Sequence, residues 1–184
     1  MTDAIDQLYE RMLIARCQAG DADAFTEIVG RYQARLRYFL RKIGGAETSV
    51  DDLLQDVWLD VFRSLVKLND PAAFPAWVYR IARDRAFREF RRTERLTLLE
   101  ADTANELLDE ESDTAFTAED ARLVHECLDE LTPRHREVLV LRFLEAMSYE
   151  DIARVVGCNV GTIRSRLHYG KQALRAAIER RGQS

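Results

Sequence analysis

The segment from Ser148 to Lys171 most strongly constrains how this chain folds, because it carries the signals of two short helices joined by a tight turn. Ser148 can cap the first helix, and Asp151 can complete that cap from the third helical position. Gly157 follows at the point where the chain must turn sharply, and glycine adopts a positive φ at little cost. The segment therefore predicts a helix-turn-helix.

The second helix of this motif has an apolar side, formed by Ile163 and Leu167, and a polar, basic side. The polar side comprises Thr162, Arg164, Ser165, Arg166, His168 and Tyr169, with Lys171 following. A helix with such a face can enter a DNA major groove and reach base edges from its first turns. Arg164 is the best candidate for a bidentate guanine contact, whereas Thr162, Ser165, Arg166 and Lys171 are suited to phosphates. The alternative is that these bases only keep the surface hydrated.

Composition favours an all-α protein. The 184 residues include only three prolines and eight glycines, and no segment alternates apolar and polar residues as a half-buried strand does. No apolar run is long enough to span a membrane, and the first residues do not resemble a secretory signal. The three cysteines Cys17, Cys127 and Cys158 form neither a zinc pattern nor a disulfide framework. We therefore expect a cytoplasmic protein that makes no direct insertion into a membrane.

The net charge of −5 conceals a division into basic and acidic segments. Residues 96–121 contain many acids and no Lys or Arg, whereas arginines crowd residues 80–95 and bases dominate from Arg154 onward. Binding to a polyanion depends on the local patch more than on the total charge. This pattern predicts a domain over 1–95, an acidic flexible linker over 96–117, and a second small helical domain over 118–184.

Hydrophobic periodicity predicts the remaining helices. We expect them over residues 5–18, from 21–23 to the Gly44-Gly45 break, over 49–65, 74–92, 118–130 and 132–143. In the first of these, Ile5, Leu8, Met12 and Ala15 recur at helical spacing. No internal repeat is found.

Two of these helices carry constellations of functional interest. On the helix from Ser49, Asp52, Gln55 and Asp56 share one face, although acids near a helix start also suit the helix dipole without further function. On the helix from Phe74, aromatic residues alternate with arginines, a combination that holds single-stranded nucleic acid. Among its aromatic residues, we expect Trp77 and Phe90 in the core and Tyr79 and Phe87 at the surface.

The chain resembles bacterial RNA polymerase sigma factors of the extracytoplasmic-function group, within the sigma-70 family. The resemblance is carried, in order along the chain, by residues 18–25, 51–58, 74–86, 131–138, 147–153 and 160–167. It extends over nearly the whole sequence, and an acidic linker stands at the corresponding place. It implies a subunit that catalyses nothing itself and needs no cofactor or metal.

The resemblance also implies three sets of binding residues. The helix from Ser49 would dock on the β′ clamp helices of core RNA polymerase, a partner that also includes the β subunit, through Asp51, Asp52, Leu54, Gln55, Asp56 and Trp58. The helix from Phe74 and the loop before it would recognise and melt the −10 promoter element through Leu68, Trp77, Tyr79, Arg80, Arg83, Asp84, Phe87, Arg88 and Arg91. The C-terminal helix would read the −35 element through Thr162, Arg164, Ser165, Arg166, His168, Tyr169 and Lys171.

Two positions depart from the family pattern. Asp84 stands where many relatives have Asn, and a carboxylate accepts hydrogen bonds but cannot donate them. Tyr169-Gly170 stands where many relatives have basic residues. Relatives are usually held inactive by an anti-sigma factor, and we expect one here. Two alternatives are a stand-alone helix-turn-helix regulator and, more remotely, a nucleic-acid-processing enzyme, although the sequence has no metal or nucleophile motif.

Overall fold

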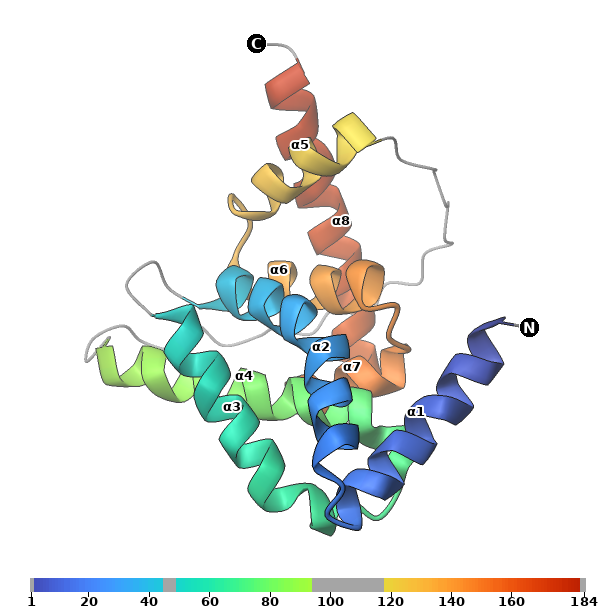
Figure 1. The fold of residues 1–184 in the computed structure, drawn as a ribbon. Coiled ribbons are helices and arrows are strands. Elements are labelled where there is room, and N and C mark those ends of the chain that lie inside the picture. Colours follow the sequence, from blue (N-terminus) through green and yellow to red (C-terminus); the bar gives the residue numbers. More distant parts are fainter. Residues whose placement is uncertain (1, 45–48, 94–117, 183–184) are drawn as a thin grey trace. The chain divides into compact units, whose positions relative to one another are not determined.

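The computed structural model describes residues 2–44, 49–93 and 118–182, and the chain divides into two helical units, Met1–Arg95 and Leu96–Ser184 (Figure 1). Every regular element in these described ranges is helical, so the all-α prediction is confirmed. The linker predicted over 96–117 lies outside the described residues. Among the helices of the described ranges, none is both long and apolar enough to cross a membrane.

Unit 1 is built around one long central helix, α2, which contacts the three other α-helices (Figure 1). A pair of short 3-10 turns lies between α3 and α4. In chain order, the elements are α1 (Thr2–Gln18), α2 (Ala22–Ile43), α3 (Val50–Ser64), η1 (Leu65–Lys67), η2 (Pro71–Ala73) and α4 (Phe74–Thr93).

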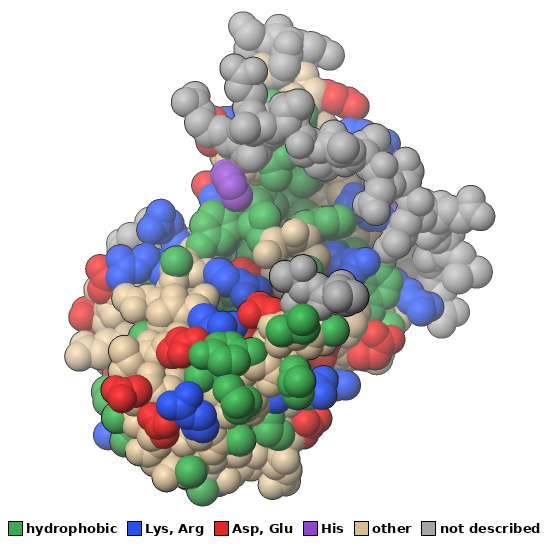
Figure 2. Space-filling model, turned by 45° about the vertical axis from the view of Figure 1, so that its right-hand side comes forward, with side chains coloured by type: hydrophobic (Ala, Val, Ile, Leu, Met, Phe, Trp, Pro, Cys, Tyr) green, Lys and Arg blue, Asp and Glu red, His purple; other side chains and the backbone are tan. Residues whose placement is uncertain are grey.

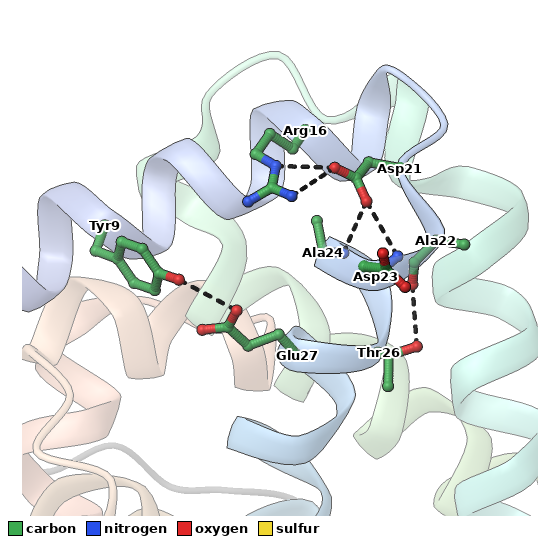
Figure 3. Close-up of polar contacts among 8 residues, drawn as sticks. All are labelled: Tyr9, Arg16, Asp21, Ala22, Asp23, Ala24, Thr26 and Glu27. Carbon is green, nitrogen blue, oxygen red and sulfur yellow. Dashed lines mark hydrogen bonds and ion pairs between the residues drawn. The ribbon is translucent and has the colours of Figure 1, made fainter.

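A side-chain cap fixes the turn between α1 and α2. One oxygen of Asp21 accepts hydrogen bonds from the backbone N–H groups of Asp23 and Ala24, each at 3.0 Å, and Nη2 of Arg16 lies 2.7 Å from the other oxygen (Figure 3). Such a cap satisfies N–H groups that have no partner inside the helix. The bond from the Ala24 N–H, followed by the one from Arg16, lowers the pKa of Asp21.

The side of α1 that faces the protein is not the one that carries the regularly spaced Ile5, Leu8 and Met12. Ile5, Leu8 and Met12 are exposed, whereas Leu13 and Ile14 are completely buried. Two polar contacts also fix this orientation: the Tyr9 hydroxyl donates to Glu27 at 3.1 Å (Figure 3), and the Tyr32 hydroxyl donates to Glu10 at 2.8 Å. α1 has apolar residues on both sides, and the packing against α2 selects the side that is buried.

Aromatic pairs join α4 to α2. The rings of Tyr32 and Phe74 meet edge to face with centroids 5.3 Å apart, and those of Phe39 and Tyr79 with centroids 5.1 Å apart. Edge-to-face contacts of this kind stabilise packing beyond the area that they bury. Because Phe74 and Tyr79 belong to α4, these contacts determine which side of α4 remains at the surface.

One arginine of α4 also joins this helix to α3. Nε and Nη2 of Arg85 donate to the two carboxylate oxygens of Asp60 at 2.5 and 2.7 Å, and Nη1 donates to Asp56 at 3.1 Å. The hydrogen bond from Arg85 lowers the pKa of Asp60. Bidentate pairs fix direction as well as distance, so this contact fixes the orientation of α3 and α4 toward each other.

Unit 2 is arranged around α8, which contacts α5, α6 and α7. In order, its elements are α5 (Ala118–Leu128), α6 (Pro133–Leu139), the π-helical turn η3 (Val140–Leu144), α7 (Tyr149–Val156) and α8 (Val160–Gly182). Thr132 caps α6 and Pro133 opens it. The helix predicted through Phe143 therefore continues past Leu139 as a π turn, in which the Glu145 N–H donates to the Val140 carbonyl at 3.2 Å.

Ala146, just after this turn, has a φ of +52°, a left-handed conformation that costs an L-residue about 1–2 kcal/mol. We predict that Ala146→Gly stabilises unit 2 by up to about 1 kcal/mol, because glycine removes this cost but adds chain entropy to the unfolded state. Thermal unfolding followed by circular dichroism measures the change, and a lower melting temperature for the variant would contradict the prediction.

The Arg85–Asp60 pair predicts an acid-labile contribution to stability. The pKa of Asp60 is lower in the folded state than in the unfolded state. The pair therefore contributes fully to the free energy of unfolding at pH values above the unfolded-state pKa, and this contribution is lost as the pH falls through the folded-state pKa. We expect Asp60→Asn to cost roughly 1 kcal/mol at pH 7, with a smaller cost below about pH 4. Urea unfolding across this pH range tests it, with Glu179→Gln as the exposed control; a cost independent of pH would refute it.

Candidate functional site

The first turns of α3 display a cluster of acids and one amide. Ser49 caps the helix by accepting the Asp52 N–H at 3.3 Å, and Asp51, Asp52, Gln55 and Asp56 are all exposed. We call Asp52, Gln55 and Asp56 the acidic face. Its members occupy neighbouring positions on one side of the helix, as the spacing predicted.

The acids around this face differ in how much of their charge is already compensated. Asp51 pairs with Arg37 at 3.0 Å, and Asp56 pairs with Arg85 at 3.1 Å. Within the described part of the chain, Asp52 makes no ion pair. Asp52 is therefore the carboxylate of this face most available to a basic group on a partner.

The two apolar residues predicted for this site, Leu54 and Trp58, are less exposed than residues that contact a partner usually are. Leu54 is buried in the core of unit 1, so its side chain is not accessible at the surface where it was predicted to contact the polymerase. Its position on the inward stripe with Leu53, Val57 and Val61 is the physical reason. Trp58 is half-buried, with its ring edge to face with Phe25 at 6.1 Å.

The apolar surface next to the acidic face consists instead of residues that the sequence reasoning missed. Leu59, Phe62 and Val66 are exposed, Phe62 at 65%, and Phe62 meets Phe25 at 5.4 Å. Elsewhere on the protein, one surface likewise exposes hydrophobic side chains among acidic and basic ones (Figure 2). The available signal was their spacing, which places them on the side of the helix opposite the inward stripe.

The aromatic residues of α4 are divided between the core and the surface differently from the prediction. Tyr79 has 0% exposure, so its expected position at the surface is wrong and its ring cannot contact DNA. The cause is that α4 packs against both α2 and α3, which buries a broader side than one stripe. Trp77 and Phe87 are half-buried, and the side chains of Phe90 and Arg91 lie outside the described ones.

The exposed side of α4 carries arginines and one acid. Arg80, Asp84 and Arg88 are exposed, one helical turn apart. Arg83 stacks its guanidinium on the Phe87 ring, 4.5 Å from the centroid. We call Arg80, Arg83, Asp84, Phe87 and Arg88 the arginine face. Leu68, in the preceding loop, is half-buried, and its carbonyl accepts a hydrogen bond from Gln18 at 2.7 Å.

The helix-turn-helix predicted in unit 2 is present. Ser148 caps α7 by accepting the Asp151 N–H at 3.0 Å, and Gly157 ends it with a φ of +76°. The side chain of Asn159 then accepts the Thr162 N–H at 2.7 Å at the start of α8. These local bonds fix the turn, and Ile163 and Leu167 bury the inner side of α8.

The predicted DNA-contacting residues of α8 share its outer surface but are not equally available. Arg164 and Lys171 are exposed, whereas Arg166 and His168 are half-buried. The hydroxyls of Thr162 and Ser165 already donate hydrogen bonds locally, to the side chain of Asn159 just before the helix at 3.0 Å and to the Gly161 carbonyl at 3.1 Å. Tyr169 is partly exposed, with its ring edge to face with His168.

Gly170 lies on the side of α8 that packs against α6, and not on the side proposed to face the DNA groove. A methyl group added there would lie 3.3 Å from two carbon atoms of Leu139, which is tighter than ordinary van der Waals contact. The glycine therefore allows α6 and α8 to approach closely. Many relatives have a basic residue where this chain has Gly170, but here the position serves the packing of α8 against α6. Of the two differing positions, only Tyr169 lies on the outer surface.

The positive charge of the C-terminal turns of α8 is partly compensated by nearby acids. Arg180 and Arg181 bond to Glu130, in the turn after α5, at 3.1 and 2.7 Å, and Arg181 also reaches Glu126 on α5 at 2.7 Å. The bonds from Arg180 and then Arg181 lower the pKa of Glu130. Three other bases of α8, Arg164, Lys171 and Arg175, are exposed and precede these last turns.

Comparisons with known proteins match both units. The Sigma-70 region 2 model matches residues 28–96, and the Sigma-70 region 4 model matches residues 121–174. The chain is 29% identical over 185 residues to the ECF RNA polymerase sigma-E factor of Haemophilus influenzae, covering 95% of this chain and 97% of that protein. It is 29% identical over 186 residues to the RNA polymerase sigma-H factor of Pseudomonas aeruginosa, covering 95% and 96%.

Two solved structures share the fold. CnrH, in complex with the cytosolic domain of CnrY, has a TM-score of 0.66 and 29% identity, covering 92% of this chain and 97% of that one. RpoE in complex with the anti-sigma factor NepR from Bartonella quintana has a TM-score of 0.65 and 21% identity, covering 84% and 96%. With two region models matched in order across more than half its length, the chain belongs to the sigma-70 family, as an extracytoplasmic-function sigma factor of bacterial RNA polymerase.

Proposed function

We propose that this chain binds core RNA polymerase and directs transcription initiation at promoters with −35 and −10 elements. The observation that carries the proposal is the order of the two matched regions, region 2 on unit 1 and region 4 on unit 2. Members of this family are promoter-specificity subunits and not enzymes. The polymerase therefore performs the chemistry, and this chain selects where it starts.

The acidic face of α3 is proposed to bind the polymerase. An exposed carboxylate without an internal partner, as at Asp52, can pair with a basic group on the β′ clamp helices. The exposed side chains of Leu59, Phe62 and Val66 continue the surface with apolar area, and interfaces commonly combine an apolar centre with a charged rim. These features support a docking surface along α3 that combines charge with apolar contact.

The arginine face of α4 is proposed to hold the −10 element. Arg80 and Arg88 are exposed and can reach phosphates, while Phe87 offers an aromatic surface beside them. Opening the duplex costs a few kcal/mol for each unstacked base, which contacts with the released base must offset. An arginine and aromatic surface provides contacts of that kind.

The start of α8 is proposed to read the −35 element in the major groove. The turn fixed by Gly157 and Asn159 directs the first turns of α8 outward, and Arg164 is exposed there. A guanidinium can bond both O6 and N7 of guanine. Arg166 and Lys171 are positioned for phosphates.

Regulation by a protein partner is part of the proposal. The relative CnrH was solved with the cytosolic domain of CnrY bound, and we propose that an anti-sigma factor similarly holds this chain inactive in the cytoplasm. The stand-alone regulator considered above is disfavoured, because it leaves the match of unit 1 to Sigma-70 region 2 without an explanation.

The docking proposal predicts the effect of one charge reversal. Asp52→Lys should reduce the affinity for core polymerase at least about tenfold, since it replaces an attraction with a repulsion worth 1–2 kcal/mol or more. Fluorescence titration of labelled protein with core polymerase measures this loss. Asp52 forms no ion pair within the described chain, so helicity should be unchanged. Glu179→Lys on α8 is the matched control, and equal affinities for the two variants would contradict the proposal.

The −35 proposal predicts a loss of discrimination at α8. Arg164→Ala should lower the preference for the best −35 sequence over a guanine-substituted one by about 1–3 kcal/mol. Competition between promoter templates for the reconstituted holoenzyme measures this preference. Arg175→Ala removes an exposed arginine three turns farther along the same helix and should leave the preference intact. A loss that is the same for both variants would show that α8 contributes only general attraction.

A further inference from the structure

Asp84 is an exception on the arginine face, and its environment indicates a role in base selection. It is the only acid between Arg80 and Arg88, a stretch that holds four other charged residues, all arginines. Its side chain is 52% exposed. The inference that follows rests on the proposed function of α4 in binding the −10 element.

Asp84 contributes little to holding the fold. Its oxygens lie 4.0 Å from Nε of Arg80 and 4.0 Å from Nη1 of Arg83, at the outer limit of an ion pair. Exposed pairs of this kind contribute little or nothing measurable. By contrast, Asp60 on the neighbouring helix bonds Arg85 through both oxygens at 2.5 and 2.7 Å. The carboxylate of Asp84 is therefore available to another partner.

On a surface that binds DNA, a carboxylate reduces general affinity. It repels phosphates and cancels part of the attraction from Arg80 and Arg83. It also accepts hydrogen bonds and donates none. The groups of a nucleobase that satisfy it are N–H donors, and the exocyclic amino groups of cytosine, adenine and guanine are such donors. Unpaired thymine offers only its N3–H, which stands between two carbonyl oxygens that both repel the carboxylate, so it is a poorer partner than an exocyclic amino group.

We propose that Asp84 selects, at one position of the −10 element, a base that carries an exocyclic amino group, and disfavours thymine there. The carboxylate accepts the amino N–H. The guanidinium of Arg80, one helical turn away on the same face, donates to an acceptor atom beside that amino group. Adjacent donor and acceptor groups of this kind discriminate bases more sharply than either one alone.

A selection experiment tests the proposal with the complete holoenzyme. Core polymerase is combined with wild-type protein, Asp84→Asn or the charge-matched control Glu179→Gln, and each holoenzyme selects from promoters randomised across the −10 region. We expect wild-type and Glu179→Gln holoenzymes to deplete thymine at one position. Asp84→Asn should tolerate thymine there, because an amide presents both a donor and an acceptor. Asp84→Ala, which presents neither, should also lose the depletion.

A second measurement isolates the amino group. At the selected position, templates carry either 5-methylcytosine or thymine, which share the methyl group and differ at the 4-amino or 4-oxo group and the adjacent N3 proton. Wild-type holoenzyme should prefer 5-methylcytosine by about 5- to 100-fold, and Asp84→Asn should bring the ratio close to one. Cytosine, adenine and guanine at that position identify which amino-bearing base fits best.

The outcomes separate this inference from the function on which it rests. If wild-type and Asp84→Asn holoenzymes select the same bases with the same strength, the inference is overturned while the −10 role of α4 stands. If the wild-type holoenzyme enriches no −10 sequence, the proposed function fails, and the inference fails with it. Arg80→Gln should weaken binding to amino-bearing templates more than to thymine templates, and a uniform loss would contradict the paired contact.

Discussion

The packing of α4 against α2 and α3 is the constraint on which the rest of unit 1 depends. Edge-to-face contacts bury Phe74 and Tyr79 against α2, and Arg85 bonds two acids of α3. With these two sides occupied, one side of α4 remains exposed, and it carries Arg80, Asp84 and Arg88. The same contacts hold α3 so that its acidic face points away from the core. The surfaces proposed for polymerase and for DNA are therefore consequences of one packing arrangement.

Internal ion pairs decide which charges can act on a partner. The sequence places many arginines near α4 and along α8, but Arg85, Arg180 and Arg181 are compensated by acids within their own units. Arg80, Arg88 and Arg164 remain exposed. Since exposed charges are the ones that attract a polyanion and respond to salt, less basic charge is available to a partner than the sequence indicates. The available charge includes Arg80 and Arg88 on the face proposed for the −10 element and Arg164 on the face proposed for the −35 element.

Features set by short stretches of sequence were predictable. The caps at Asp21, Ser49 and Ser148 and the left-handed Gly157 follow from bonds between residues a few positions apart, so the helices and the helix-turn-helix could be located without the structure. Features set by tertiary neighbours were not. Tyr79 is buried because α4 is covered on two sides, and Gly170 serves a close approach to Leu139. The side of α1 that turns inward depends in the same way on α2. The sequence pattern located the acidic face, but not the exposed apolar side chains beside it.

As a promoter-specificity subunit, this chain should act on promoters only as part of a complex with RNA polymerase. The most direct test compares binding to one duplex promoter by the protein alone, by core polymerase alone and by the two together, in a footprinting assay across a range of salt. We expect protection of the −35 and −10 regions only for the mixture, with strand opening at −10. Tight, sequence-specific protection by the protein alone, unchanged when polymerase is added, would contradict it and favour a stand-alone regulator.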